Sequence, residues 1–450
     1  MANFFKPSTK KQPTGQVISV LIDRLDHNGI GVGEYKNKPI FIASTLPKEK
    51  VTAKIVEAKS KFYKANVIEL VNSSEHRVKP PCKHFKTCGG CDLQHLSFQE
   101  HLAFKQQKLI DLFSRNNINT NLPWQESITS DALHYRRKAR IGVQYNKLGE
   151  PIVGFRQKAS NNLVQLKECI VLVEPIKHVF TILTSQIKSL SLVKSIGHVE
   201  IIYTQHISII IRQLIPLNEQ DKTLWKNIAE QHQWQVYIDN GKEVTPLTPV
   251  TPLFYQISEQ SGISQNHVSE SVINIYFEPK DFIQVNHHVN NQMIMQALNW
   301  LDLQEDDQVL DLFCGLGNFS LPIARKVKSV VGIEGLQTMV DKATYNAQMS
   351  KLDNTEFFQA DLNSNWGNQA WAHKKYSKVL LDPARAGAYE ALVQLIDLDI
   401  SHIVYVSCDP ATLAKDSQLL INNGYTIEKI AIMDMFAQTK HIETMVLFKK

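Results

Sequence analysis

The chain has 450 residues, of which 43% are hydrophobic and 21% charged. This balance excludes wholesale disorder, and at roughly 150 residues per domain the length allows about three domains. The net charge is +5, but residues 1–80 hold 14 Lys and Arg against 7 Asp and Glu, so a small basic segment precedes a nearly neutral body. Such a segment suits a polyanion such as RNA, although a solvated lysine face explains the charge at least as well.

Several classes of protein are excluded by simple features of the chain. No apolar run reaches the roughly 18 residues that a membrane-spanning helix needs. The first residues lack the apolar core of a secretory signal. Six cysteines in 450 residues do not make a disulfide framework. We therefore expect a cytoplasmic protein with no membrane partner and no obligate protein partner, whose clustered cysteines need another explanation.

The N-terminal part predicts a short arm followed by a small β-barrel. Residues 1–14 are polar and aperiodic, so we expect a flexible arm there. Residues 15–74 contain short runs rich in β-branched residues, and strands are expected over 16–21, 39–42, 50–56 and 64–70. Three alternate glycines over 29–33 fit turns and barrel bends better than a phosphate loop, because no Lys-Ser/Thr follows them. An OB-like barrel of this kind would bind oligonucleotides.

The central part, 75–278, predicts an α+β domain. An amphipathic helix is expected over 97–115, because apolar residues recur there at helical spacing. Strands are expected over 139–145, 199–203, 207–212 and 235–238. The segment 134–140 interleaves an aromatic residue with four cations, a pattern that can grip phosphates and stack a base.

In the C-terminal third, strands and helices alternate, which predicts a parallel sheet covered by helices. The first strand ends in Asp311-x-Phe313-x-Gly315-x-Gly317, and glycines at a strand-to-helix turn let the backbone approach a ligand. Glu334 ends the second strand 19 residues after Gly315, a spacing that suits a ribose hydroxyl pair. These features predict a site for an adenosine cofactor.

The third glycine of a dinucleotide-binding turn is missing, because Ser320 stands in its place. This favours S-adenosylmethionine, which has no pyrophosphate and needs no third glycine. Asp361 and Asp382 end the next two strands, where they are placed to contact the adenine and the amino-acid end of the cofactor. The series of strand-end acids makes this prediction specific.

Two further strand ends offer reactive groups. A hydrophobic strand delivers Cys408 to its carboxyl end, where open α/β sheets bind ligands. Cys408 is therefore a candidate nucleophile; the alternative is an inert buried cysteine. Glu443 opens the last strand and is a candidate general base, although a carboxylate at a strand start is usually only solvated.

A cysteine cluster predicts a metal site. Cys82, Cys88 and Cys91 lie within ten residues, and Cys169 is the fourth candidate ligand. Four thiolates fit either a tetrahedral Zn²⁺ or an iron–sulfur cluster, and the spacing alone does not choose between them. His84 could replace one cysteine if the metal were zinc.

Together these features resemble the RNA uracil-C5 methyltransferase family, and within it the 23S rRNA (uracil-1939-C5) type with an N-terminal TRAM domain and a [4Fe–4S] cluster. The resemblance covers nearly the whole chain. It rests on the Cys-x5-Cys-x2-Cys cluster with Cys169 and on Asp23-to-Gly33, Tyr135-Arg-x-Lys-Ala-Arg140, Phe282-x-Gln-Val-Asn286, Asp311-to-Ser320, Asp382-Pro-Ala-Arg385, Ser407-Cys-Asp-Pro410 and His441-x-Glu443.

The resemblance implies an α/β fold: a class I (Rossmann-like) methyltransferase domain over 279–450, preceded by an OB-like TRAM barrel and the α+β central domain. It also implies that the helix near 97–120 packs on the catalytic domain. The implied cofactor site comprises Gln284, Phe313, Asn318, Glu334, Asp361 and Asp382. The implied cluster ligands are Cys82, Cys88, Cys91 and Cys169. Where the wider family often has Pro-Pro after the aspartate, this chain has Pro383-Ala384.

The implied reaction transfers a methyl group from S-adenosylmethionine to C5 of a specific uracil in 23S ribosomal RNA. Attack of Cys408 on C6 makes C5 nucleophilic, and Glu443 removes the C5 proton after transfer. The uracil has to be flipped out or single-stranded to reach such a site. The cluster is expected to have a structural or RNA-contact role.

Three alternatives stay open. The same chemistry could act on transfer RNA or on two 23S sites. A radical methylthiotransferase also combines a cluster, S-adenosylmethionine and a TRAM domain, but its cysteine spacing and C-terminal TRAM differ from this chain. A non-catalytic RNA-binding or redox-sensing protein is a further class, against which the presence of both Cys408 and Glu443 argues.

Overall fold

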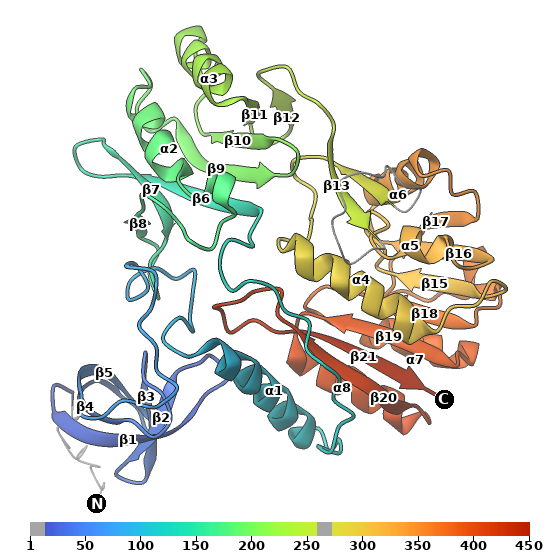
Figure 1. Ribbon diagram of the computed structural model, residues 1–450, viewed down its shortest axis with the longest axis horizontal. Coiled ribbons are helices and arrows are strands. Elements are labelled where there is room, and N and C mark those ends of the chain that lie inside the picture. Colours follow the sequence, from blue (N-terminus) through green and yellow to red (C-terminus); the bar gives the residue numbers. More distant parts are fainter. Residues whose placement is uncertain (1–13, 259–271) are drawn as a thin grey trace, which may run out of the picture. The chain divides into compact units, whose positions relative to one another are not determined.

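The computed structural model describes residues 14–258 and 272–450 (Figure 1). The predicted arm over 1–14 therefore lies almost wholly outside the described residues. The chain forms two compact units. The smaller unit holds the described residues up to Lys86 together with Gly90–Phe104 and Gln438–Lys440, and the larger unit holds the remainder.

The smaller unit contains a closed five-stranded barrel in the order β1-β2-β3-β5-β4. Its strands are β1 Val17–Leu25, β2 Gly31–Tyr35, β3 Lys38–Ile42, β4 Lys50–Ala58 and β5 Tyr63–Leu70. Alternate residues point inward, so that Ile22, Ile40 and Val51 fill the interior. Lys36 and Asn37, both with positive φ, form the two-residue hairpin that joins β2 to β3.

The expected strands did not include β2, because its glycines had been assigned only to turns and bends. A Cβ atom on Gly31 would lie 2.0 Å from Thr45 Oγ1, and one on Gly33 would lie 2.2 Å from the carbonyl oxygen of Leu21. The two glycines therefore allow close approach of neighbouring segments inside the barrel wall. Gly29, with a φ of +74°, does occupy a turn.

The larger unit contains two seven-stranded sheets. In the first, α2 Val179–Lys188 and α3 Glu219–His232 cover one face through a core that includes Phe180, Leu183 and Trp225. The strand order is β12-β11-β10-β9-β6-β7-β8. The strands are β6 Lys138–Tyr145, β7 Pro151–Arg156, β8 Leu163–Gln165, β9 Ile196–Tyr203, β10 Ile207–Gln213, β11 Trp234–Asp239 and β12 Val244–Pro246. The four strands expected here are confirmed.

The second sheet has the order β17-β16-β15-β18-β19-β21-β20. Its strands are β15 Gln308–Leu312, β16 Ser329–Glu334, β17 Thr355–Gln359, β18 Lys378–Leu381, β19 His402–Ser407, β20 Thr426–Met433 and β21 Glu443–Lys449. The expected parallel sheet is confirmed except at β21, which runs antiparallel to both of its neighbours. No helix separates β20 from β21, so the chain has to return in the opposite direction.

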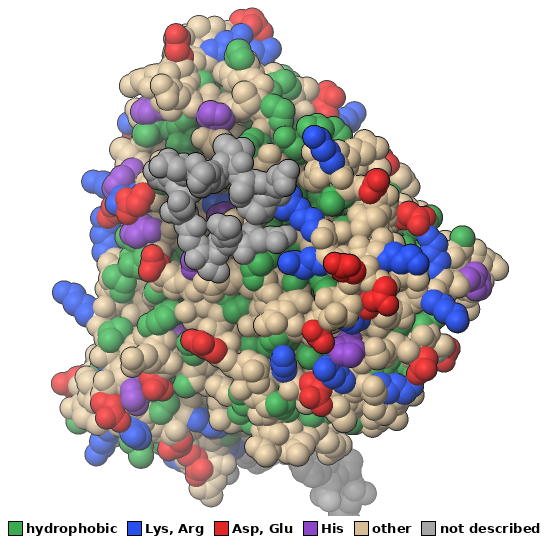
Figure 2. All heavy atoms as spheres, turned by 45° about the vertical axis from the view of Figure 1, so that its right-hand side comes forward, with side chains coloured by type: hydrophobic (Ala, Val, Ile, Leu, Met, Phe, Trp, Pro, Cys, Tyr) green, Lys and Arg blue, Asp and Glu red, His purple; other side chains and the backbone are tan. Residues whose placement is uncertain are grey.

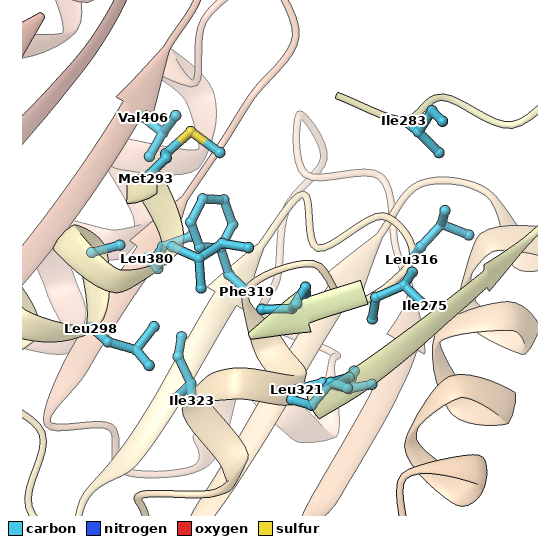
Figure 3. Packing of buried hydrophobic residues seen from close by; sticks show 14 of the residues in the cluster. Ile275, Ile283, Met293, Leu298, Leu316, Phe319, Leu321, Ile323, Leu380 and Val406 are labelled. Carbon is cyan, nitrogen blue, oxygen red and sulfur yellow. The ribbon is translucent and has the colours of Figure 1, made fainter. Parts of the chain in front are cut away.

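The helices around the second sheet alternate with its strands along the chain (Figure 1). They are α4 His287–Leu301, α5 Ser320–Ala324, α6 Gln337–Met349, α7 Tyr389–Leu395 and α8 Pro410–Asn422. Before α4, strands β13 Leu253–Ser258 and β14 Val272–Phe277 form a hairpin. One core joins Ile275 of the hairpin and Met293 of α4 to Leu380 and Val406 of the sheet, with Phe319 among them (Figure 3).

Helix α1, Phe98–Arg115, matches the amphipathic helix that the sequence predicts. Its Lys105 ammonium donates to Asp434 Oδ1 at 2.5 Å and to the carbonyl oxygen of Phe436 at 3.2 Å. Further along the chain, Trp124 forms an isolated bridge to Ile430 at the edge strand β20. Among the described residues, no helix is long and apolar enough to cross a membrane.

Candidate active site

The turn after β15 carries the predicted cofactor motif. Phe313, Gly315 and Gly317 all have positive φ, at 63°, 55° and 88°. Glycine is favoured in this region of conformational space, and a Cβ atom on Gly317 would also lie 2.2 Å from Leu321 Cδ1. Glu334 at the end of β16 braces the turn, because its Oε2 accepts a hydrogen bond of 3.2 Å from the Gly315 amide.

Acidic side chains gather at the carboxyl ends of the central strands. Asp311 is buried, and burial together with the charges of Asp382 and Glu334 raises its pKa to about 7, although the Ser320 hydroxyl donates to it. Burial also raises the pKa of Asp382, which follows β18, to about 7. Both carboxyls are therefore partly protonated at neutral pH, and a cationic ligand beside them would favour their ionised form. Asp361 differs: it is exposed and accepts hydrogen bonds from its own loop, which lower its pKa.

Asn318 is held by residues from outside the turn. Its Oδ1 accepts from the Tyr255 hydroxyl at 2.8 Å and from Asn290 Nδ2 at 3.2 Å. Gln284 is half-buried, and its carbonyl oxygen accepts from Arg137 Nε at 2.9 Å. Tyr255, Asn290 and Arg137 were not singled out individually from the sequence, because nothing local marks them; only the packing of β13, α4 and β6 brings them to this place.

Cys408 follows the end of β19, and Glu443 is the first residue of the neighbouring strand β21. Because the two strands are antiparallel, both residues lie at the same end of the sheet. Ser407 of β19 pairs with Thr444 of β21, so Cys408, one residue later, lies opposite Glu443, one residue earlier. Asp409 caps helix α8 by accepting hydrogen bonds from the amides of Ala411 and Thr412, which fixes the corner just after Cys408.

Both groups hold their protons in this environment. Burial, followed by the charges of Glu443 and Asp382, raises the pKa of Cys408 to about 12, and Arg385 opposes that shift. Burial and the charge of Asp382 raise the pKa of Glu443 well above its usual range, against the influence of Arg385 and Lys105. The candidate nucleophile Cys408, the candidate base Glu443 and the predicted cofactor contact Asp382 therefore influence one another electrostatically.

The predicted metal ligands are all half-buried. The Cys82 amide donates to Gln94 Oε1 at 3.1 Å, and the Cys169 amide donates to the carbonyl oxygen of Lys177 at 3.0 Å. The backbone of Cys88 forms an isolated antiparallel β-bridge with that of Gln157. Over residues 14–258 and 272–450, the structure shows no group of three or more His, Cys, Asp or Glu side chains gathered to hold a metal ion. Burial raises the pKa of the remaining cysteine, Cys314, well above its usual range.

Comparison with known families agrees with this geometry. Residues 97–450 match the tRNA (uracil-5-)-methyltransferase family, and residues 11–68 match the TRAM domain. The chain belongs to the tRNA (uracil-5-)-methyltransferase family. It is therefore an S-adenosylmethionine-dependent RNA uracil-C5 methyltransferase, and the expected α/β fold with an N-terminal barrel is confirmed.

Two curated relatives and one solved structure of this family match along nearly the whole chain. A 23S rRNA (uracil(1939)-C(5))-methyltransferase of Colwellia psychrerythraea is 48% identical over 100% of this chain and 99% of its own. An enzyme of the same name from Vibrio vulnificus is 42% identical over 100% of both chains. The crystal structure of a Pyrococcus abyssi tRNA (uracil-54, C5)-methyltransferase with S-adenosyl-L-homocysteine shares the fold, with a TM-score of 0.72, 20% identity and coverage of 96% of this chain and 100% of its own.

Proposed function

We propose that this enzyme methylates C5 of a specific uracil in 23S ribosomal RNA. The observation that carries the proposal is the placement of Cys408 opposite Glu443, with Asp382 acting electrostatically on both. The full-length relatives named for 23S rRNA support the substrate, and a TRAM domain supports RNA binding. As an RNA-modifying enzyme, the protein is proposed to act in the cytoplasm.

The proposed cofactor site comprises Gln284, Phe313, Asn318, Glu334, Asp361 and Asp382. S-adenosylmethionine supplies an electrophilic methyl group on a positively charged sulfonium. The acids at the strand ends suit this molecule, because two of them, Asp311 and Asp382, are buried carboxyls that a nearby cation would ionise. Asn318 is held in place by Tyr255 and Asn290, so it offers a fixed polar contact.

In the proposed mechanism, the Cys408 thiolate attacks C6 of uracil, and the resulting enolate places electron density on C5. After methyl transfer to C5, Glu443 removes the C5 proton and the C6–S bond breaks, which releases the Cys408 thiolate. The raised pKa values of Cys408 and Glu443 mean that the protein by itself keeps both groups protonated at neutral pH. A positive charge bound beside Asp382 would lower both values and so prepare the site for reaction.

We also propose that Cys82, Cys88, Cys91 and Cys169 hold a [4Fe–4S] cluster with a structural or RNA-contact role. Support comes from the chemistry of the donors, since four thiolates are the usual ligands of such a cluster. Anaerobic reconstitution, followed by absorbance and by iron and sulfide analysis, tests this proposal, and Cys91→Ser should lower the iron content. The role is refuted if loss of the cluster leaves fold and RNA affinity intact but abolishes methyl transfer.

We propose three domains, with a barrel over 15–74, a central domain over 75–278 and a catalytic domain over 279–450. The region near 97–120 is proposed to pack on the catalytic domain. The ion pair between Lys105 of α1 and Asp434 supports this interleaving.

Transfer RNA is the second candidate substrate, because the matching family and the Pyrococcus abyssi structure are both named for transfer RNA. A covalent trapping experiment separates the two substrates. RNA that contains 5-fluorouracil should form a stable adduct with Cys408, since fluorine cannot leave as a proton does. We expect an adduct with a 23S fragment, no adduct with transfer RNA and none with Cys408→Ala, as read by denaturing gels and mass spectrometry.

Glu443→Gln is the matched variant in this experiment. It keeps the nucleophile but removes the base, so a methylated adduct should accumulate on RNA with ordinary uracil. An adduct that survives Cys408→Ala would refute the assigned nucleophile. An adduct with transfer RNA alone would move the proposed substrate to that class.

A further inference from the structure

Acidic and basic side chains are interspersed on the face drawn in Figure 2, so the charge of this face does not mark a path for RNA. The basic segment 134–140 is more informative, because the structure gives each of its cations a different environment. Three of its cations have polar or aromatic partners within the protein, and the fourth, Arg137, has a nitrogen without a hydrogen-bond partner among the described residues.

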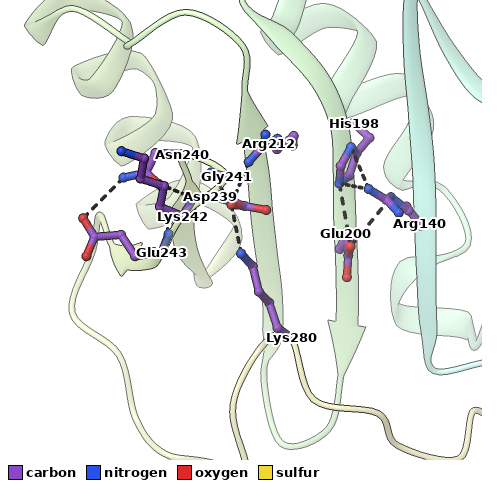
Figure 4. A network of polar contacts seen from close by, with 10 residues as sticks. All are labelled: Arg140, His198, Glu200, Arg212, Asp239, Asn240, Gly241, Lys242, Glu243 and Lys280. Carbon is purple, nitrogen blue, oxygen red and sulfur yellow. Dashed lines mark hydrogen bonds and ion pairs between the residues drawn. The ribbon is translucent and has the colours of Figure 1, made fainter.

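Arg140 lies at the surface, where its guanidinium meets His198 at 2.9 Å and Glu200 at 3.7 Å (Figure 4). Lys138 donates to the backbone carbonyls of Asp281 and Pro279 at 2.6 and 3.1 Å. Arg136 donates from Nε to the Lys138 carbonyl at 3.1 Å, and its guanidinium lies 5.9 Å from the centre of the Phe436 ring. The partners of these three cations leave little need for a ligand.

Arg137 is different, because it is 5% exposed and its partners among residues 14–258 and 272–450 are all neutral. Its Nε donates to the Gln284 carbonyl, and its Nη1 meets His287 Nδ1 at 3.3 Å. The pKa of His287 falls to about 4 through burial and the Arg137 charge, so that ring is uncharged at neutral pH. The guanidinium also lies 4.7 Å from the centre of the Tyr255 ring, and its Nη2 is buried with no hydrogen-bond partner among the described residues.

A buried cation with one unsatisfied nitrogen and no facing carboxylate is costly to keep in a folded protein. Within the described part of the chain, no Asp or Glu forms an ion pair with Arg137. Burial lowers its pKa only to about 10, so the charge persists at neutral pH. An anion that arrives with a ligand would supply the missing partner.

The position of Arg137 connects it to the reaction site. It stacks on Tyr255, whose hydroxyl binds Asn318 in the cofactor turn, and it holds the backbone of Gln284. S-adenosylmethionine has a net positive charge and suits the acids at the strand ends. RNA has one negative charge per nucleotide and suits a guanidinium, whose fork matches phosphate geometry.

We propose that Arg137 binds a phosphodiester oxygen of the RNA next to the target uracil. This inference rests on the proposed function and adds to it the residue that anchors the RNA backbone at the active site. The other cations of the segment are held by partners within the protein.

Arg137→Met and the matched surface variant Arg140→Met test the proposal in the full-length enzyme. Fluorescence anisotropy gives the Kd for a 23S rRNA fragment over a range of salt concentrations. We expect Arg137→Met to weaken RNA binding roughly tenfold to a hundredfold, the range for a hydrogen bond to a charged group. The slope of log Kd against log salt should fall by roughly 0.7, the value for one phosphate of a single strand. Arg140→Met should change the Kd by about twofold or less, as for an exposed ion pair.

The carboxylate of S-adenosylmethionine is the other anion that could pair with Arg137. Calorimetric titration with S-adenosylmethionine tests this alternative. The Kd for S-adenosylmethionine should be unchanged in Arg137→Met. If this Kd rises while RNA binding stays the same, the partner is the cofactor carboxylate and the proposal is wrong. If neither Kd changes in the folded variant, Arg137 is structural and the proposal is also wrong.

A measurement on the wild-type enzyme keeps the test decisive if Arg137→Met does not fold. Uncharged methylphosphonate linkages are placed singly on either side of the target uracil. One linkage should weaken wild-type binding, and Arg137→Lys, which keeps the charge without the fork, should show a smaller loss there. Equal affinity at every linkage overturns the proposal. Failure of the wild-type enzyme to methylate the RNA would instead overturn the proposed function.

Discussion

At the scale of single residues, the site depends on groups whose protonation the fold controls. Asp311, Asp382, Cys408 and Glu443 all have raised pKa values, and burial is the largest cause in each case. A site of this kind is unfavourable for the protein by itself and becomes favourable when a cation enters it. Perturbed groups gathered at strand ends are the physical mark of a functional site.

Asp311 gives the first prediction at this scale. Its pKa is about 7 in the folded protein against an ordinary value of 3.8, so the stability it contributes is complete below pH 4 and is lost as the pH rises through 7. Asp311→Asn removes that loss, which is on the order of a few kcal/mol. Melting temperatures measured without cofactor from pH 4 to 8 should therefore favour the variant more at the alkaline end. Parallel curves for the two proteins would contradict the assigned pKa.

At the scale of elements, the end of the sheet with the candidate base is linked to a helix from the N-terminal part of the chain. Helix α1 contributes Lys105, which is fully buried and paired with the fully buried Asp434 in the loop between β20 and β21. The same loop leads to Glu443. Burial raises the pKa of Glu443, and the charge of Lys105 opposes part of that rise. A long-range ion pair thus links an N-terminal helix to the loop that carries the candidate base.

Breaking this pair should be costly. Lys105→Met leaves the Asp434 carboxylate buried without its partner, and we expect a loss of roughly 3–5 kcal/mol in unfolding free energy. The double variant Lys105→Met/Asp434→Leu removes both charges and should recover most of that loss. Urea denaturation of the wild type, both single variants and the double variant gives the coupling energy. A double variant as unstable as the sum of the singles would show that the pair does not act as a unit.

At the scale of the whole molecule, two compact units share one chain. The proposed cofactor residues all belong to the larger unit. A ligand that binds only the folded form of one unit raises the stability of that unit alone, by about 2.7 kcal/mol at a concentration one hundred times its Kd.

Calorimetry with and without S-adenosyl-L-homocysteine tests this division. We expect two unfolding transitions, one for each unit. Only the transition of the larger unit should move to higher temperature when the ligand is added. Asp382→Asn should reduce that shift and leave the transition of the smaller unit at the same temperature. A single transition that moves as a whole would mean that the units unfold together.

Local sequence patterns predicted most of the strands of this enzyme and the strand ends at which its candidate site residues lie. Hydrophobic runs followed by a single acid or cysteine placed Asp311, Glu334, Asp382 and Cys408 correctly, because a strand and its terminal residue are adjacent in the chain. The missed strand β2 shows where this reasoning fails, since its glycines are required by close contacts with residues distant in the chain.

The tertiary structure alone decided which of these groups face one another. Cys408 and Glu443 lie at adjacent strand ends because β21 runs antiparallel beside β19, and the order of strands is set by packing over long separations in the chain. The isolation of Arg137 among neutral partners likewise follows from the meeting of β6, β13 and α4. Burial and pairing are properties of the folded neighbourhood, so a linear pattern of cations could predict an RNA-binding segment but not which cation keeps an unsatisfied nitrogen.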